Sequence, residues 1–136
     1  MEDLIRFIEF PVIGDERGSL VALESMKDVP FDIKRVYYLY GMQSELPRGF
    51  HAHKELIQIA ICVKGSCDIL MDNGIKKEVV NLSSPSRGLI INTMQWHEMS
   101  NFSNDCILLV LASDVYDESD YIRDFSEFTR IINAGF

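Results

Sequence analysis

Two of the three histidines in this chain, His51 and His53, stand one residue apart. In a β-strand, residues two positions apart point to the same face, so a strand through this segment would hold both imidazoles side by side. An unperturbed imidazole titrates near pH ~6.5 and can therefore accept and donate protons at neutral pH. The pair predicts general acid–base chemistry between two neighbouring rings.

The segments around the pair have the pattern of an all-β protein. Turn signals recur every eight to twelve residues, and the apolar or alternating runs between them predict strands at 20–23, 33–40, 55–64, 66–71, 75–82, 89–92 and 106–112. Asn73-Gly74 predicts a two-residue hairpin turn with positive φ at both positions. We expect a double-sheet jelly roll of eight to ten short strands, in a single domain spanning residues 1–136.

The last segment has a different periodicity. Tyr121, Phe125 and Phe128 recur at helical spacing, and Ser119 or Asp120 is a candidate N-cap. We expect a short C-terminal helix that packs against the barrel or across a dimer contact.

Composition excludes several classes of protein. Thirteen basic against 21 acidic residues give a net charge of −8, which disfavours nucleic-acid binding. No apolar run approaches the ~20 residues of a membrane span, and the first residues are acidic where a secretory signal would be basic. The three cysteines, Cys62, Cys67 and Cys106, lie in apolar runs without metal-binding spacing, so we expect buried, reduced thiols in a cytoplasmic protein.

All three histidines fall on motif positions of the cupin family, which this sequence resembles. His51 and His53 match the His-x-His of the first motif, and Gly65 follows at the expected distance. His97, with Asn101 four positions later, matches the end of the second motif. The resemblance implies that the histidines face the interior of a barrel.

The match departs from the cupin pattern at Gln58, which stands where the first motif has a glutamate. Divalent ions favour an anionic oxygen, so a neutral carboxamide weakens a metal site. We expect no bound metal, although three histidines and a water could still hold zinc. The usual proline and glycine of the second motif are also replaced, by Asn92 and Met94.

A narrower resemblance covers nearly the whole chain. The stretch RGFHAHK at 48–54 is similar to the dTDP-4-keto-6-deoxyglucose 3,4-ketoisomerases, as are, in the same order along the chain, RGSL (17–20), KRVYY (34–38), WHEM (96–99), LASD (111–114) and YDESDYIR (116–123). That family moves a keto group from C4 to C3 of a dTDP-linked sugar, without metal or other cofactor, in deoxyamino-sugar biosynthesis. The resemblance implies such an isomerase, and a homodimer with exchanged N-terminal strands.

The chemistry of this reaction suits the histidine pair. In a 3,4-keto shift, a proton leaves C3 to form an enediolate. A proton then moves between the two oxygens, and C4 is reprotonated. We expect His51 to move the carbon proton and His53 the oxygen proton, with the reverse assignment open.

Substrate-binding residues follow from charge and position. Arg48 and Arg17 each precede a glycine and could bind the diphosphate, while Arg87 and Arg123 are weaker candidates. Tyr38, with Tyr37 as the equal alternative, could bond a sugar oxygen. Gln58 and His97 complete the expected substrate-binding set. Within the resembled family, the combination of Arg17 and His97 implies a galacto product.

The sequence leaves three other functions as alternatives, two of them from different classes. One is a metal-dependent cupin enzyme such as a dioxygenase, with the three histidines as ligands. The other is a non-catalytic protein that binds a sugar nucleotide. A sugar-nucleotide 3,5-epimerase is a related alternative, which would also exchange a proton at C5.

Overall fold

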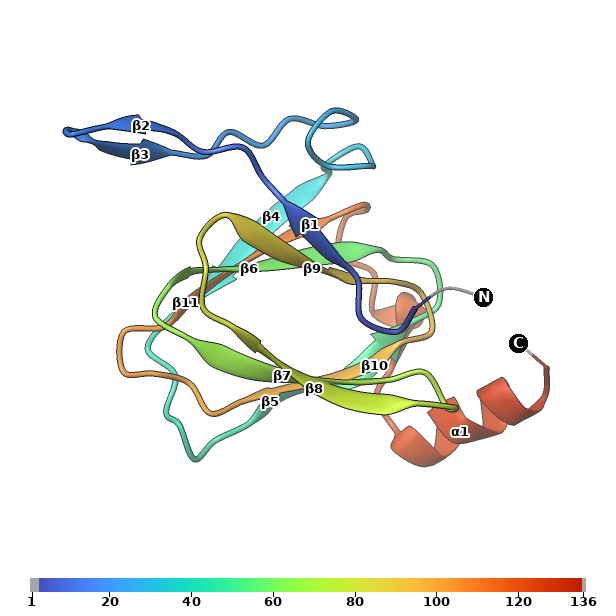
Figure 1. Cartoon of the computed structure of the whole chain (residues 1–136). Coiled ribbons are helices and arrows are strands. Elements are labelled where there is room, and N and C mark those ends of the chain that lie inside the picture. Colours follow the sequence, from blue (N-terminus) through green and yellow to red (C-terminus); the bar gives the residue numbers. More distant parts are fainter. Residues whose placement is uncertain (1–2, 136) are drawn as a thin grey trace.

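Two five-stranded antiparallel sheets face each other in the computed structural model, which describes residues 3–135 (Figure 1). In spatial order, the first sheet contains β1 (Phe7–Glu9), β9 (Arg87–Ile91), β6 (Gln58–Lys64), β11 (Ile107–Ala112) and β4 (Arg35–Leu39). The second contains β12 (Tyr121–Ile122), β5 (Arg48–His53), β10 (Trp96–Ser100), β7 (Cys67–Asp72) and β8 (Lys77–Leu82). This arrangement confirms the predicted double-sheet jelly roll.

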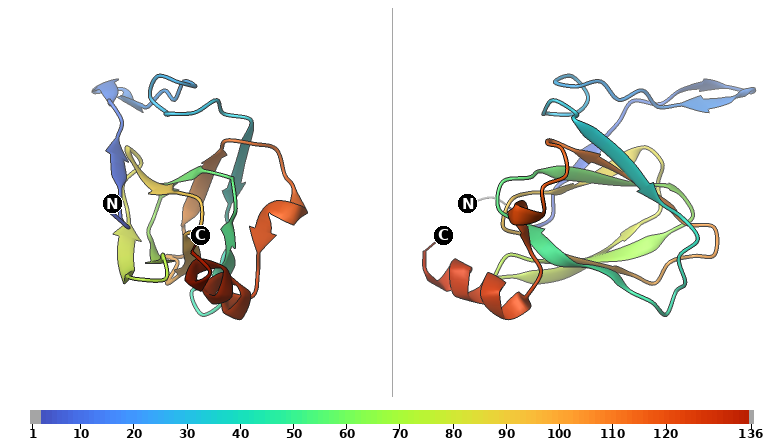
Figure 2. Two further views of the ribbon diagram at one scale, coloured as in Figure 1. Left: turned by 90° about the vertical axis from the view of Figure 1, so that its right-hand side faces the viewer. Right: turned by 180° about the vertical axis from the view of Figure 1, so that it is seen from behind.

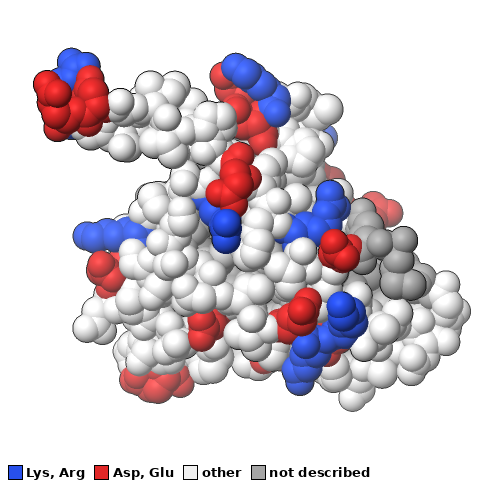
Figure 3. All heavy atoms as spheres, viewed as in Figure 1, with Lys and Arg blue, Asp and Glu red and all other residues white. Residues whose placement is uncertain are grey.

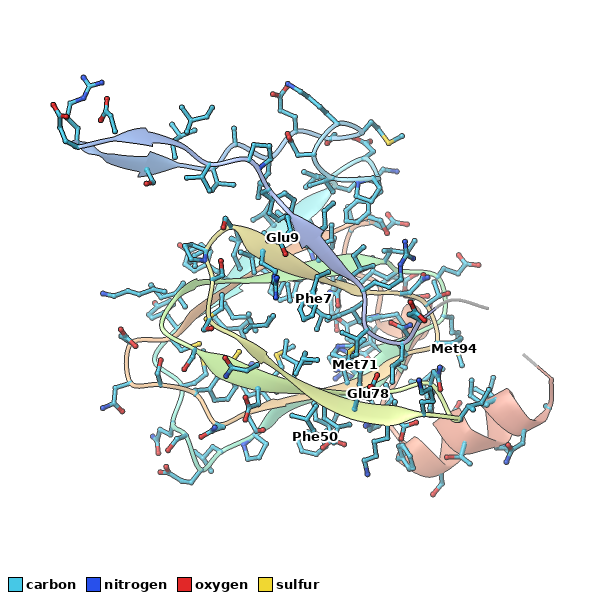
Figure 4. All side chains as sticks on the ribbon, viewed as in Figure 1. Phe7, Glu9, Phe50, Met71, Glu78 and Met94 are labelled. Atoms are coloured by element: carbon cyan, nitrogen blue, oxygen red, sulfur yellow. The ribbon has the colours of Figure 1, made fainter. Side chains whose placement is uncertain are left out.

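Apolar side chains fill the space between the sheets, into which Met71 points (Figure 4). The central strand β6 is buried on both faces. Ala60 and Cys62 belong to the core between the sheets, while Ile59 and Ile61 pack with apolar residues of the N-terminal segment. A strand covered on both faces requires apolar side chains at successive positions, which explains the continuous apolar run in its sequence.

The β7–β8 hairpin forms where Asn73-Gly74 predicted it, but its turn is wider than expected. Residues 73–76 separate the strands, and of these only Gly74 has a positive φ, of 89°. The Asn73 side-chain oxygen accepts hydrogen bonds from the backbone N–H groups of Ile75 and Lys76, at 2.9 and 2.8 Å. These bonds stabilise the four-residue loop, so the two-residue turn prediction was wrong and the strand pairing was right.

The C-terminal helix begins later than the sequence predicted. Residues 118–120 form a 3₁₀ turn, η1 (Glu118–Asp120), and Tyr121 and Ile122 pair with β5 as strand β12. The helix is α1 (Phe125–Asn133), with Asp124 as its N-cap in place of the predicted Ser119 or Asp120. Pairing with the edge of β5 satisfies backbone groups that a longer helix would have bonded internally. No helix within residues 3–135 is long and apolar enough to cross a membrane.

The described residues contain twelve strands, more than the eight to ten expected, because several are only two or three residues long. Two of the short ones, β2 (Ile13–Asp15) and β3 (Gly18–Leu20), form a separate hairpin. Figure 2 shows that this hairpin stands clear of the barrel. Of the predicted strand 20–23, only Leu20 lies in a strand, as the last residue of β3, so that prediction was wrong for residues 21–23. Segment 96–100, for which the sequence predicted no strand, forms β10.

Candidate active site

Strand pairing brings the three histidines into one cluster. His97 of β10 lies opposite His51 of β5, and His53 follows on the same face of β5. The ring centroid of His51 lies 4.9 Å from that of His53 and 4.5 Å from that of His97. One ring nitrogen of each histidine lies within 4.8 Å of the other two, so the cluster also has the geometry to hold a metal ion.

A bulge in β5 aims His51 into the barrel. Gly49 and Phe50 have positive φ values of 94° and 60°, and the register with β10 shifts between His97 and Glu98. Phe50 points away from the space between the sheets (Figure 4). A positive φ in phenylalanine is strained backbone, and such strain concentrates at functional sites.

The residues of η1 and β12 cover the histidines from the side. The ring of Tyr121 lies 4.9 Å from that of His51 and 4.4 Å from that of His53, measured between centroids. A carboxylate oxygen of Asp120 lies 3.4 Å from Nδ1 of His53. The same carboxylate accepts hydrogen bonds from the backbone N–H groups of Glu55 and Leu56, which hold it in place.

A pocket of ≈ 380 Å³ opens beside the cluster. Of the three histidines only His51 lines it, while His53 and His97 are buried behind. Its other walls are cationic, aromatic, apolar and backbone groups from Arg35, Arg48, Arg123, Tyr37, Tyr121, Leu39, Met99 and Gly49. Three guanidinium groups suit an anionic ligand, and the apolar side chains suit a less polar part of the same molecule.

Burial lowers the pKa of all three imidazoles. Desolvation is the main cause, and it is reinforced for His53 and His97 by repulsion from His51, so that the pKa of each falls to about 3. The pKa of His51 is also lowered, although its bond to the Gly49 carbonyl opposes the shift. At neutral pH all three rings are therefore uncharged.

The hydrogen bonds of the rings fix which nitrogens are free. Nδ1 of His51 donates to the Gly49 carbonyl at 3.1 Å, and Nδ1 of His97 donates to the Gln95 carbonyl at 3.1 Å. A carbonyl oxygen only accepts, so both protons must sit on Nδ1. This leaves Nε2 of His51 with a lone pair that can act as a base.

Several buried polar atoms beside the cluster have no hydrogen-bond partner among residues 3–135. They are both ring nitrogens of His53, Nε2 of His97 and the side-chain oxygen of Gln58. The Gln58 amide donates to the Tyr37 hydroxyl at 2.8 Å, which fixes its orientation. Because buried polar groups are nearly always paired, these atoms are suited to meet polar groups of a ligand.

The structure corrects one predicted residue and separates another from the cluster. Tyr38 points outward and is 63% exposed, whereas its alternative Tyr37 lines the pocket, because side chains alternate along β4. Arg17 lies at the tip of the β2–β3 hairpin, where it pairs with Asp15 at 2.6 Å. It does not line the pocket of its own chain. By contrast, Arg48 lines the pocket.

Sequence reasoning missed or undervalued several pocket residues. Arg35 was not singled out, although strand alternation with Tyr37 could have placed it on the same face. The helical spacing predicts Tyr121 in a helix, and Arg123 is one of the weaker candidates for the diphosphate. The sequence predicts no contact between Asp120 and His53, because nothing local indicates that residue 120 meets residue 53.

Comparison with known proteins gives the family. Residues 3–133 match the family model described as FdtA: WxcM-like, C-terminal. A TDP-4-oxo-6-deoxy-alpha-D-glucose-3,4-oxoisomerase from Aneurinibacillus thermoaerophilus is 50% identical over 127 residues, which are 93% of this chain and 91% of the relative. The chain belongs to the sugar 3,4-ketoisomerase family. This confirms the resemblance carried by the sequence motifs.

Solved structures extend the likeness to other 3,4-ketoisomerases. A mutant of the 3,4-ketoisomerase QdtA from Thermoanaerobacterium thermosaccharolyticum, in complex with TDP-4-keto-6-deoxyglucose, gives a TM-score of 0.95 at 40% identity and covers 100% of this chain and 99% of that one. The TDP-quinovose 3,4-ketoisomerase WlaRB from Campylobacter jejuni gives 0.89 at 49% identity and covers 93% and 97%. The ketoisomerase likeness therefore includes the whole barrel.

Proposed function

We propose that this chain converts dTDP-4-keto-6-deoxyglucose to a dTDP-3-keto-6-deoxyhexose, as a step in deoxyamino-sugar biosynthesis. The observation that carries the proposal is a cluster of uncharged histidines, one of which, His51, opens onto a pocket with three arginines. The reaction is an internal redox exchange, since C4 is reduced while C3 is oxidised. It requires proton transfers and no external electron carrier.

The first step in this proposal is removal of the C3 proton by His51. Nε2 carries the free lone pair, because Nδ1 is bonded to the Gly49 carbonyl. The C3–H electron pair forms a C3=C4 double bond, and the C4 carbonyl oxygen becomes the enediolate oxygen. Burial lowers the pKa of His51, so at neutral pH the ring is uncharged and its Nε2 lone pair is available to accept the proton.

The second step moves a proton from the C3 oxygen to the C4 oxygen, and we assign it to His53. Nδ1 of this ring faces Asp120 at 3.4 Å, while Nε2 has no hydrogen-bond partner among residues 3–135, so we assign Nε2 to the substrate oxygens. Protonation of C4 by His51 then leaves a carbonyl at C3. The Asp120 carboxylate beside Nδ1 stabilises the His53 imidazolium that forms in passing.

The substrate fits the pocket by charge. We assign Arg48, Arg35 and Arg123 to the diphosphate, although Arg123 must first share or release Glu118, to which it donates at 2.8 and 2.9 Å. Tyr37 and Gln58 are assigned to sugar oxygens. No metal or other cofactor takes part in this proposal.

The proposed product has the galacto configuration, because the combination of Arg17 and His97 resembles the galacto type of this family. Configuration depends on which face of C4 receives the proton, and His97 sets the position of His51 by packing against it. Overall identity does not decide this point, since a relative named for TDP-quinovose is 49% identical. Proton coupling constants of the product in an NMR spectrum distinguish the two configurations.

We also propose a homodimer in which the β2–β3 hairpin packs against a second copy. The stem of the hairpin exposes Val12, Ile13 and Leu20 by 52 to 66%. Figure 3 shows charged atoms gathered at its tip and uncharged surface along its stem. Apolar side chains on a projecting hairpin favour burial by a partner, and this would carry Arg17 towards the partner's pocket.

The direct test incubates chelator-treated protein with dTDP-4-keto-6-deoxyglucose and follows the 3-keto product by NMR. We expect turnover by the wild type and a loss of about 10²- to 10⁴-fold in His51→Asn, the usual size of a general-base contribution. Binding of dTDP by the variant, measured by calorimetry, controls for folding. Activity that disappears on chelation and returns with a metal ion would instead support the metal-dependent enzyme. If the wild type binds the sugar nucleotide but does not turn it over, the result would support a non-catalytic protein.

A further inference from the structure

A second cluster of potential ligands lies at the other end of the barrel core. Cys62 near the end of β6, Cys67 at the start of β7 and Cys106 just before β11 are all buried, with 3% exposure or less. The turn at Gly65 brings the first two together, and β11, the neighbour of β6, brings the third. Cys62 is four residues along β6 from Gln58, about 13 Å at the usual rise, so this cluster is separate from the histidines.

The three thiols converge on one point. Their sulfur atoms all lie within 4.8 Å of one another, and those of Cys62 and Cys106 are 3.8 Å apart. Two thiolates that bind the same ion at about 2.3 Å are about 3.8 to 4.0 Å apart, in tetrahedral or trigonal geometry. An ion could therefore be accommodated with small movements of the side chains.

The ligand set favours a particular kind of ion. No histidine or carboxylate among the described residues joins the three sulfurs as a fourth ligand. The nearby Asp105 carboxylate accepts a hydrogen bond from the Ser103 hydroxyl at 2.8 Å. Structural zinc requires four ligands, whereas soft thiolates alone suit monovalent copper.

We propose that Cys62, Cys67 and Cys106 form a three-coordinate site for a soft d¹⁰ cation, with monovalent copper as the best-fitting ion. Each coordinating thiol loses its proton to solvent, and the copper keeps its oxidation state. The bound ion would link β6, β7 and the start of β11 at the end of the barrel core away from the histidines. It would add stability and take no part in the isomerisation.

The test titrates the reduced full-length protein, without oxygen, with monovalent copper supplied as its bicinchoninate complex. We expect transfer of one copper ion per chain, with thiolate-to-copper charge-transfer absorption in the near ultraviolet. Cys67→Ser should bind at least ten-fold more weakly. The variant His51→Asn/His97→Asn, which disrupts the other possible ligand cluster, should still take up one ion.

Thermal unfolding of the wild type gives a second measurement that does not depend on the folding of a cysteine variant. Copper should raise the melting temperature, and an equal concentration of zinc should raise it less. Failure of the wild type to take copper from the chelator would overturn the proposal. Equal copper uptake by the wild type and Cys67→Ser would also overturn it. The same holds if the histidine variant loses copper uptake while Cys67→Ser keeps it.

Discussion

The charge state of His51 decides how the proposed reaction depends on pH. Burial lowers the pKa of His51 below its ordinary value of 6.5, so the free base persists into mildly acidic solution. We expect kcat/KM to be level from pH 8 down to about 6.5 and to fall below that, as the ring becomes protonated. A pH profile of product formation, followed by NMR, measures this. An acidic limb centred above pH 7 would contradict the assignment of His51 as the buried neutral base.

Asp120 is expected to act as a positioning residue for His53. Its carboxylate lies 3.4 Å from Nδ1 of the ring and is held by two backbone N–H groups. Asp120→Asn should lower kcat about ten-fold with little change in KM, because the ring loses its orienting charge. The amide nitrogen cannot accept, so one of the two backbone hydrogen bonds is lost as well.

Asp117→Asn is the matched control, because this carboxylate belongs to the same segment but bonds Ser119 rather than a histidine. It should leave kcat near that of the wild type. Equal losses in kcat for both variants, or a loss confined to KM, would show that Asp120 acts through the local fold alone.

Neutral buried histidines also make stability depend on pH. The unfolded chain protonates His97 near pH 6.5, whereas the folded chain does so only near pH 3. Stability is therefore fully present above pH 6.5 and is lost as the pH falls towards 3, by about 2 kcal/mol at pH 5 for one such group. Urea unfolding of wild type and His97→Gln at pH 7.5 and 5 tests this. The variant should lose less stability between the two pH values, and an equal loss would contradict the assignment.

At the scale of elements, the bulge in β5 couples backbone conformation to the site. A β-carbon at Gly49 would lie 3.0 Å from the His97 carbonyl oxygen, in a residue with a φ of 94°. We expect Gly49→Ala to reduce stability by about 2 kcal/mol or more and to lower kcat, because β5 and β10 must separate where His51 meets His97.

Gly41→Ala supplies the comparison, since Gly41 also has a positive φ, of 70°, but its added β-carbon would meet nothing within 4 Å. This variant should lose about 1 kcal/mol and keep its kcat. If Gly49→Ala and Gly41→Ala behave alike in thermal unfolding and in the activity assay, Gly49 is not required for the close approach of β5 and β10.

At the scale of the whole molecule, the position of Arg17 leads to a complementation experiment. If each hairpin delivers Arg17 to the partner's pocket, Arg17→Ala and His51→Asn homodimers should both be impaired. Mixing them with subunit exchange forms heterodimers with one intact pocket, so activity should return to about a quarter of wild type per subunit.

The same mixture regains no activity if Arg17 serves the pocket of its own chain, or if it stays in solvent and reaches no pocket. Light scattering establishes independently whether the protein is dimeric. A monomer at assay concentrations would contradict both the homodimer and the delivery of Arg17 in trans.

The sequence alone determined the main features of the fold and the centre of the site. Period-two spacing of His51 and His53 requires a shared face in any strand, and alternating runs between turn signals indicate paired sheets. These are local properties of the chain, so one sequence suffices to find them. Local pattern also favoured Asn73-Gly74 as a hairpin, although side-chain hydrogen bonding made the loop longer.

Only the tertiary structure decided which distant residues meet. Asp120 reaches His53 because β12 pairs with the edge of β5, and Tyr37 rather than Tyr38 faces the pocket because of how β4 is oriented in its sheet. The cysteines lack metal-binding spacing along the chain, yet three different segments bring their sulfurs together. Contacts between segments far apart in sequence depend on strand order and register, which local periodicity does not encode.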